Sequence, residues 1–503
     1  MAGRHRLGAP DGVSPTAVAS LAIRHGAGRT AVRRVNKGVR GRAVLVAAAS
    51  ALAVAALVVT SHPPGGARPA FGGVDLALGG VVGMRGTSDS PPTTASCRAQ
   101  SAGKSACYDP AQLRAAYDLA PLYAKGIEGQ HQTIVIVDSF GSPTITADLA
   151  AFDAAFSLPA PPSFRIIRPR GPIPPYTATG KDRFGWATET SLDVEWAHAL
   201  APMASILLVE TPTDEVEGTT GFPDIVAAEN YVIKHRLGTV ISQSFGATEQ
   251  TFSSKSQVTK LRSAFLAAEK ANVTVLGGSG DLGATDFKSN AKDIYPFRVT
   301  SWPASDPLVT AVGGTYLNLN DQGKPLAPAS AWNDTFARTP PYPAATGGGH
   351  SEFFARPAYQ DGVSAVAGTH RAVPDISMSA SCSGFVDVYV SAAGNGGHPW
   401  LKLCGTSEAT PEFAAIVALA DQVAGHGLGL LNPALYALQH VANSGLVAVT
   451  SGNNTVAFVS KGKTVTVQGF PATAAYNLAT GLGTIDAALF VPALVHEWKL
   501  LHP

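Results

Sequence analysis

A serine at the start of a predicted helix is the first residue placed for chemistry. The stretch Cys404-Gly405-Thr406-Ser407 leads into the apolar, alanine-rich run 413–420, which predicts a turn followed by a helix. The free N–H groups and the positive dipole end at a helix N-terminus favour a developing negative charge. A serine before a helix is also an ordinary N-cap. Ser407 therefore needs reactive partners before it can be interpreted as a nucleophile.

Two carboxylates on another predicted helix could supply such a partner. Glu189 and Asp193 are four residues apart, so on a helix both side chains face the same way. Two neighbouring carboxyls cannot both ionise cheaply, and one of them tends to hold a proton. The pair could serve as an acid/base relay in mildly acidic conditions, or it could be a solvated acidic face. We interpret His198, on the same predicted helix, as a packed or hydrogen-bonded histidine.

Two glycine-rich stretches carry further polar side chains. Gly277–Gly283 follows an apolar strand and places Asp281 at its carboxyl end, where an active site is expected in a parallel sheet. The alternative there is a tight turn that favours aspartate. Gly347–Gly349, beside His350 and aromatic residues, suits a backbone surface for an extended peptide, or is simply a flexible loop.

The elements that must position these residues follow an α/β pattern. Short apolar strands are predicted at 132–138, 206–209, 239–242 and 273–276. Helices are predicted between and after them, at Ser191–Ala199, Pro223–Lys234 and Lys255–Ala271. Buried apolar strands that alternate with helices predict a mostly parallel sheet covered on both faces.

Charge is distributed unevenly along the 503 residues. Residues 1–42 contain nine Lys/Arg and one acid, a net charge of +8, whereas the remainder has 37 − 9 = 28 bases and 36 − 1 = 35 acids, a net charge of −7. A mildly acidic body argues against nucleic acid as a partner. With 45% hydrophobic residues, the chain can bury a sizeable core.

The N-terminal segments predict an exported protein. Residues 1–42 predict a disordered cytoplasmic segment. Residues 43–60 contain no charge, which is typical of a signal peptide or a single membrane anchor. The alternative for 43–60 is an ordinary buried helix. Residues 61–107 are rich in Gly, Pro and Ser and predict a linker. The predicted catalytic domain is 108–490, followed by a tail, 491–503. The body would be extracellular, either secreted or held at the outer face of the membrane.

Four cysteines in an exported chain suggest two disulfides. Three pairings are possible from the sequence. Nearness along the chain favours Cys97–Cys107 and Cys382–Cys404. The second of these would brace the turn that carries Ser407.

Together these stretches resemble the sedolisin family, the serine-carboxyl peptidases, from about Tyr108 to about Asp486. The family's motifs occur in its order, at Glu189 and Asp193, Ser279–Gly283, Pro303–Ser305 with Thr310–Thr315, Gly347–Ser351 with Arg356–Gln360, Val373–Ser377 and Gly405–Pro411. The resemblance implies a subtilisin-like three-layer fold and an endopeptidase with a Ser-Glu-Asp triad, acting on proteins or peptides.

The resemblance also implies a role for each matching residue. Ser407 would attack the peptide carbonyl, Glu189 would take its proton, and Asp193 would orient Glu189. Asp281 would help to hold the oxyanion, which a carboxyl can do only when protonated, and we therefore expect activity at acidic pH. Residues expected to flank the substrate are Ser242, Ser244, Gly278 and Gly348.

Two features depart from the family pattern. Sedolisins usually bind calcium through an Asp-Ile pair and a Gly-x-Gly-Trp-Asp stretch, but the matching places here include Ala448, Val449 and Asn477. Because calcium needs charged oxygen ligands, we expect a weak calcium site or none, and no other cofactor. A folded propeptide of the family's usual size also has no room between residue 60 and Tyr108.

Two other readings compete with an exported acid endopeptidase. A Ser-His-Asp triad with Asp138 lacks a suitable histidine, because His198 and His350 stand in the wrong sequence contexts. A catalytically inactive relative could act as a surface binding protein. Whether the protein is an active peptidase or an inactive relative, we expect it to be a monomer.

Overall fold

The computed structural model of the chain describes residues 82–177, 181–337 and 339–503. The chain divides into residues 1–65 and residues 66–503, and every described residue belongs to the second unit. The predicted segments 1–42 and 43–60, and the first part of the predicted linker, lie outside the described residues. Within the described ranges, no helix combines the length and apolar character that crossing a membrane requires.

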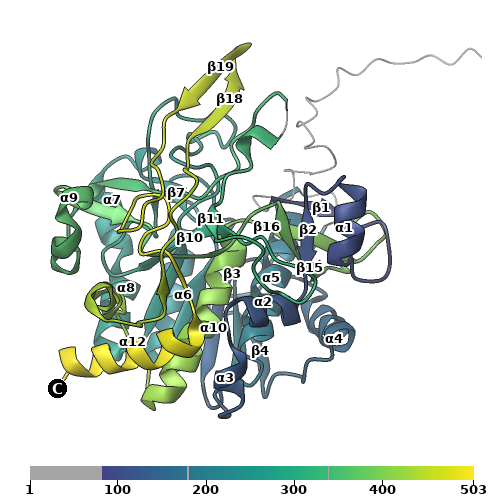
Figure 1. Cartoon of the computed structure of the whole chain (residues 1–503), viewed down its shortest axis with the longest axis horizontal. Coiled ribbons are helices and arrows are strands. Elements are labelled where there is room, and N and C mark those ends of the chain that lie inside the picture. The colour runs from purple at the N-terminus through teal and green to yellow at the C-terminus, as the bar shows by residue number, and fades with distance from the viewer. Residues whose placement is uncertain (1–81, 178–180, 338) are drawn as a thin grey trace, which may run out of the picture. The chain divides into compact units, whose positions relative to one another are not determined.

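A largely parallel sheet runs through the centre of the described residues (Figure 1). Every pair in it is parallel except β10 with β11. The four strands predicted from the sequence are confirmed as β3, β5, β6 and β8. In spatial order the strands are β11 Ser330–Ala331, β10 Thr310–Tyr316, β8 Thr274–Gly278, β6 Val240–Gln243, β3 Thr133–Ser139, β5 Ser205–Thr211 and β4 Phe164–Ile167, with β14 Ile376–Ser379 also paired to β10.

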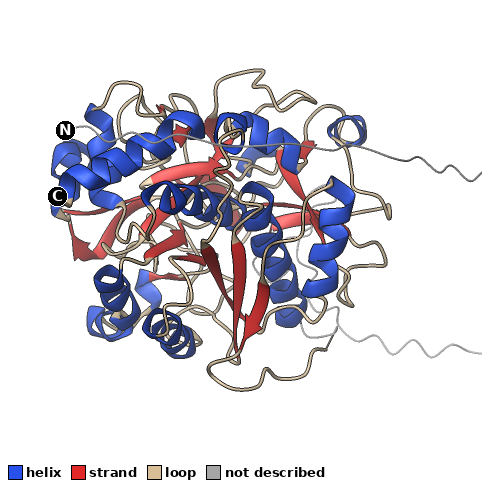
Figure 2. Ribbon diagram, turned by 90° about the horizontal axis from the view of Figure 1, so that it is seen from below, coloured by secondary structure: helices blue, strands red, loops and turns tan. Residues whose placement is uncertain are grey.

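Helices cover both faces of this sheet (Figure 2). Because strand side chains alternate between faces, Ile134 and Ile136 of β3 enter one core and Val135 and Val137 enter another. The first core contains side chains of α5 Lys181–Leu200, α10 Thr406–Ala424 and α12 Ala487–Leu501, and the second contains those of α6 Phe222–Lys234 and α8 Ser263–Ala271. The predicted α/β class with a central, mostly parallel sheet is confirmed.

The predicted helices differ from the observed ones at their ends. The prediction Ser191–Ala199 captured only the second half of α5, because residues 184–200 are buried all round and show no polar stripe that would mark a helix. The prediction Lys255–Ala271 covers two helices, α7 Lys255–Leu261 and α8. Arg262 separates them, with a ψ of 3° that departs from α-helical geometry.

The end of the predicted linker and the predicted C-terminal tail are corrected by the structure. β1 Val82–Arg85 pairs with β16 Trp400–Cys404, and β2 Ala106–Tyr108 pairs with β15 Gly384–Tyr389, in a second sheet of order β1-β16-β15-β2. Residues from Val82 onward therefore belong to the folded domain, although 61–107 reads locally as linker. The predicted tail 491–503 is mostly α12, whose buried residues include Leu494 and Val495.

Both disulfides predicted from nearness along the chain are confirmed. Cys97 in α1 Thr94–Gln100 is bonded to Cys107 in β2. Cys382 is bonded to Cys404, the last residue of β16 and three residues before Ser407. The second disulfide ties the approach to Ser407 to the segment that connects β14 with β15.

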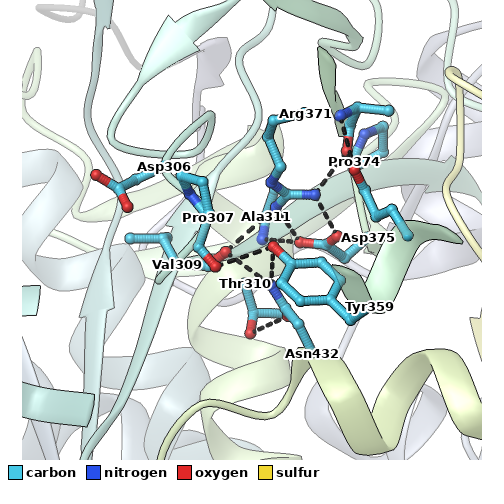
Figure 3. Close-up of polar contacts among 12 residues, drawn as sticks. Asp306, Pro307, Val309, Thr310, Ala311, Tyr359, Arg371, Pro374, Asp375 and Asn432 are labelled. Carbon is cyan, nitrogen blue, oxygen red and sulfur yellow. Dashed lines mark hydrogen bonds and ion pairs between the residues drawn. The ribbon is translucent and has the colours of Figure 1, made fainter. Parts of the chain in front are cut away.

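A buried ion pair holds the region between β13 His370–Val373 and β14 against the central sheet (Figure 3). The Arg371 guanidinium faces the Asp375 carboxylate, and neither side chain is exposed. Asp375 Oδ2 also accepts from the Ala311 N–H of β10 at 2.8 Å, and Oδ1 accepts from the Tyr436 hydroxyl at 2.8 Å. Buried charges are stable only when paired and hydrogen-bonded, and this cluster meets that condition.

The remaining elements connect and flank these layers. The further helices are α2 Pro110–Ala116, α3 Ala120–Tyr123, α4 Ile145–Phe156, α9 Ser364–Ala367 and α11 Asn432–Ala437. The further strands are β7 Ala247–Thr248, β9 Ser301–Trp302, β12 Gly349–Ala355, β13 His370–Val373, β17 Leu446–Val447, β18 Val456–Ser460, β19 Lys463–Val467 and β20 Thr484–Ile485.

Candidate active site

Ser407 lies in the first turn of α10, as its sequence context predicts. Gly405, with a φ of +124°, turns the chain from β16 into the helix. A Cβ at this position would lie 2.6 Å from Asp281 Oδ2, so only glycine fits here. The turn therefore brings the Ser407 segment against the loop that carries Asp281.

Glu189 and Asp193 lie on one face of α5, four residues apart, and both are buried at 5% and 0% exposure. Burial is the main cause that raises the pKa of Glu189 well above its ordinary value, and Asp138 and Asp281 raise it further. The Ser407 side chain acts in the opposite direction and lowers the pKa of Glu189. The structure thus brings together the serine and the carboxyl that the sequence predicted as partners.

Asp193 is held by a residue of β6's carboxyl-terminal loop. The Ser244 hydroxyl donates to Asp193 Oδ1 at 2.7 Å, while Oδ2 is buried without a hydrogen-bond partner among the described residues. Burial, Asp138 and Glu189 raise the pKa of Asp193 well above its ordinary value, and the Ser244 hydrogen bond lowers it. Ser244 was predicted to flank the substrate, but its hydroxyl also fixes one carboxyl of the pair.

Asp138 adds a third buried carboxyl to this cluster. It lies near the end of β3 and is fully buried. Burial raises its pKa to about 7, so Asp138 holds a proton through the acidic range. All three carboxyls of the cluster therefore hold their protons more strongly than they would in water.

Asp281 lies beyond the carboxyl end of β8, next to the start of α10. Its Oδ1 accepts from the Thr406 N–H at 2.7 Å and from the Thr406 hydroxyl at 2.9 Å. Oδ2 is therefore the oxygen left to carry a proton. Burial raises the pKa of Asp281 to about 6, although both Thr406 hydrogen bonds act to lower it. Below that pH the carboxyl can donate a hydrogen bond.

A cavity of about 180 Å³ opens at this site, and Ser407, Glu189 and Asp281 all contribute to its wall. Two of the four residues predicted to flank the substrate, Ser244 and Gly278, also line it. The full lining is Trp186, Glu189, Glu215, Glu217, Ser244, Phe245, Gly246, Gly278, Gly280, Asp281, Leu282, Asp286, Phe287, Ser301, Thr406 and Ser407.

The other two predicted substrate residues lie outside this lining. Ser242 is fully buried within β6, and its hydroxyl has no hydrogen-bond partner among the described residues. Gly348 is packed against backbone, and a Cβ there would lie 2.0 Å from the Leu478 carbonyl oxygen. The two residues therefore occupy packing positions, at which a larger side chain would disturb the fold.

Neither histidine of the competing Ser-His-Asp reading reaches the cavity. His198 Nε2 lies 2.8 Å from the Pro159 carbonyl oxygen and 3.2 Å from Asp153 Oδ1. His350 is exposed, and its Nε2 lies 3.0 Å from the Val366 carbonyl oxygen. No histidine is among the described residues that line the cavity.

The positions that match the family's calcium site carry a different set of donors. Asn477 Oδ1 accepts from the Ala479 and Thr480 N–H groups, so its Nδ2 faces the opposite way. Nδ2 donates to the Thr473 and Ala475 carbonyl oxygens at 3.2 and 3.3 Å.

A calcium ion does not fit this arrangement. The two carbonyl oxygens already accept the Asn477 amide, and Ala448 and Val449 have no side-chain oxygen. The residues present therefore supply hydrogen bonds where the family would supply ligands.

Sequence reasoning missed the residues that hold the predicted carboxyls and those that complete the cavity. Thr406 was quoted only as part of the Gly-Thr-Ser motif, yet it fixes Asp281. Asp286 follows Asp281 by five residues, which offered some signal, whereas Glu215 and Glu217 lie in a polar loop between β5 and α6 and offered none.

Comparisons with known proteins agree with the fold, although no family model matches the chain. Kumamolisin from Bacillus sp. (strain MN-32) is 31% identical over 366 residues, 72% of this chain and 60% of kumamolisin. Tripeptidyl-peptidase 1 from Canis lupus familiaris is 28% identical over 328 residues, 63% of this chain and 53% of that protein. Sedolisin from Pseudomonas sp. (strain 101) is 25% identical over 421 residues, 82% of this chain and 66% of sedolisin. The chain thus spans between 53% and 66% of the lengths of these relatives.

A solved structure shows the same fold. Pseudomonas sedolisin, a serine-carboxyl proteinase complexed with two molecules of pseudo-iodotyrostatin, aligns with a TM-score of 0.63 and 24% identity. The alignment covers 77% of this chain and 97% of that one. Together with the kumamolisin match, this places the chain in the sedolisin family of subtilisin-like serine-carboxyl peptidases.

Proposed function

We propose that this chain is a serine-carboxyl endopeptidase that hydrolyses peptide bonds in proteins, with its best activity at acidic pH. The observation that carries the proposal is that Ser407, Glu189 and Asp281 line one cavity, where the Ser407 side chain acts on the pKa of Glu189. A nucleophile, a base and an oxyanion donor are then within one site.

The first half of the reaction would form an acyl-enzyme. Ser407 Oγ attacks the substrate carbonyl carbon while its proton passes to the Glu189 carboxylate. The carbonyl oxygen becomes an oxyanion and accepts a hydrogen bond from the protonated Asp281, which Thr406 orients. Glu189 then gives the proton to the leaving amine, and the C–N bond breaks.

The second half would release the acid product. A water molecule passes a proton to Glu189 and attacks the acyl carbon, and Ser407 regains the proton as it leaves. Asp193 holds and tunes Glu189 through both halves. Asp281 must keep its proton throughout, which supports an acidic optimum because its pKa is about 6.

We further propose that the domain acts outside the cytoplasm. The charge-free segment 43–60 after a basic stretch supports export, as do two disulfides in the folded domain. Fractionation of cells that produce the full chain, with immunodetection of the domain, tests this and shows whether it is released or tethered. Recovery of the folded domain in the cytosol would contradict it.

A pH series of cleavage assays tests the enzymatic proposal. Purified protein is incubated with casein and with a peptide library between pH 2 and 8, beside Ser407→Ala and Glu189→Gln variants whose folding is checked by circular dichroism. Cleavage by the wild type, reduced about a thousandfold or more in both variants, supports the mechanism. A folded wild type that cleaves nothing at any pH would instead indicate a binding protein.

A further inference from the structure

Three more carboxyl side chains line the cavity that contains Ser407. Glu215 and Glu217 come from the loop between β5 and α6, and Asp286 follows β8. No lysine or arginine is among the described lining residues, and none of the three forms an ion pair with a described residue. The cavity at the candidate active site is therefore lined by several carboxyl groups and by no described basic side chain.

Neighbouring groups hold two of these carboxyls in fixed positions. Glu217 Oε2 accepts from the Thr248 N–H at 2.9 Å. Asp286 Oδ2 accepts from the Ser301 hydroxyl at 2.6 Å, and Oδ1 accepts from the Phe287 N–H at 2.8 Å. Glu215 differs, because its Oε1 is buried without any hydrogen-bond partner among the described residues. The carboxyls of Glu217 and Asp286 are thus held in place, and Glu215 Oε1 can still accept a hydrogen bond from a ligand in the cavity.

The electrostatics of this wall favour a cation. Burial, together with neighbouring carboxyls that include Asp286, raises the pKa of Glu217 to about 9 and that of Glu215 to about 8. Burial likewise raises the pKa of Asp286. A cation among the three groups would reverse these effects, since an opposite charge at short range stabilises the ionised carboxylates.

The rest of the lining suits the stem of a long side chain. Trp186, Phe245, Leu282 and Phe287 supply apolar surface beside the carboxyls. A cavity of about 150 Å³ is enough for a benzene-sized group, so the observed 180 Å³ accommodates one side chain. Lysine and arginine combine an apolar stem with a charged head.

We propose that this cavity is a specificity pocket for a lysine or arginine side chain that flanks the scissile bond, with Glu215, Glu217 and Asp286 as its specificity-determining residues. The inference rests on the proposed peptidase function and adds the class of peptide on which it acts. A free α-amino group is the other cationic source that could reach the same wall.

Cleavage-site sequencing distinguishes these sources. Wild-type protein digests a library of peptides that are acetylated and amidated at their ends, and the cleaved sites are read by mass spectrometry. We expect lysine and arginine to be enriched at one position beside the cut, about tenfold or more over glutamine and methionine, which is the factor that one charged hydrogen bond provides. Cleavage without basic enrichment, or only of peptides with free amino ends, would overturn the proposal.

Variants then assign the preference to the pocket. The ratio of kcat/KM for a lysine peptide to that for the matched norleucine peptide is measured for Glu217→Gln and Asp286→Asn. Glu269→Gln on the exposed surface of α8 is the matched control. We expect each pocket variant to lower the ratio about tenfold and the control to leave it unchanged.

Failure of this inference differs from failure of the proposed function. If the wild type cleaves no peptide at all, the peptidase proposal itself is wrong. If it cleaves well but the ratio is the same in all three variants, only the pocket assignment is wrong. Thermal melting of each variant identifies any that fails to fold, and the remaining pocket variant then decides.

Discussion

Ser244→Ala tests whether the hydroxyl that contacts Asp193 supports catalysis or only touches substrate. Ser244 is the only described donor to Asp193 Oδ1, at 2.7 Å, and Oδ2 has no hydrogen-bond partner in the described part of the chain. The variant would therefore leave this buried carboxyl without a hydrogen bond.

The size of the effect follows from the chemistry of that contact. A hydrogen bond to a charged group contributes about 1.5–3 kcal/mol. Because each 1.4 kcal/mol corresponds to roughly a factor of ten in rate, kcat should fall about 10- to 100-fold if the contact is needed in the transition state. The same hydrogen bond lowers the pKa of Asp193, so its loss should move the acidic limb of the pH profile toward higher pH.

Ser242→Ala is the matched control for this experiment. It removes a hydroxyl from the same segment, two residues away, and that hydroxyl has no hydrogen-bond partner among the described residues. Steady-state kinetics from pH 2 to 8 give kcat, KM and the limbs of the profile for both variants, and thermal melting reports their stability. A Ser244→Ala variant with unchanged kcat, an unmoved acidic limb and a raised KM would refute the positioning role.

Three other outcomes follow from contacts described above. kcat/KM should fall as pH rises through about 6, because Asp281 then loses the proton that it would donate. In Asp281→Asn this fall should be absent. If the fall persists in the variant, a group other than Asp281 causes it. EDTA should leave the melting temperature of the wild type unchanged. Asn477→Ala should lower the free energy of unfolding, measured in urea, by about 2 kcal/mol or more, because two carbonyl oxygens lose their hydrogen-bond donor. Arg371→Met should cost about 3–5 kcal/mol in urea unfolding by leaving Asp375 buried and unpaired. Adding Asp375→Asn should restore part of that loss, and equal destabilisation of the single and double variants would exclude the unpaired charge as the cause.

The parts of the site that local sequence could predict are those set by one element. A four-residue spacing places Glu189 and Asp193 on one helix face, and a strand followed by glycines and Asp281 marks the end of a parallel strand. Ser407 is recognisable because a glycine turn opens directly into a helix. Each of these signals lies within one short stretch of the chain, so tertiary contacts are not needed to see it.

The contacts that support these residues could not be predicted in the same way. Ser244 meets Asp193 across 51 positions of sequence, and Thr406 meets Asp281 across 125. β1 was assigned to a linker because its residues show no strand pattern of their own. Its backbone forms a strand because it pairs with β16. Such contacts are decided by packing between distant segments, which overrides local preference.

The pairing of β16 with β1 on one side and β15 on the other affects when this protein can become reactive. During translation, β1 and β2 leave the ribosome long before β15, β16 and the turn to Ser407. Folding must therefore wait for a partner from the far end of the chain, a topology that slows assembly. A product of interrupted synthesis would contain Glu189, Asp193 and Asp281 but no nucleophile. The cell would thus be exposed to the competent hydroxyl only after β15 and β16 had both been made.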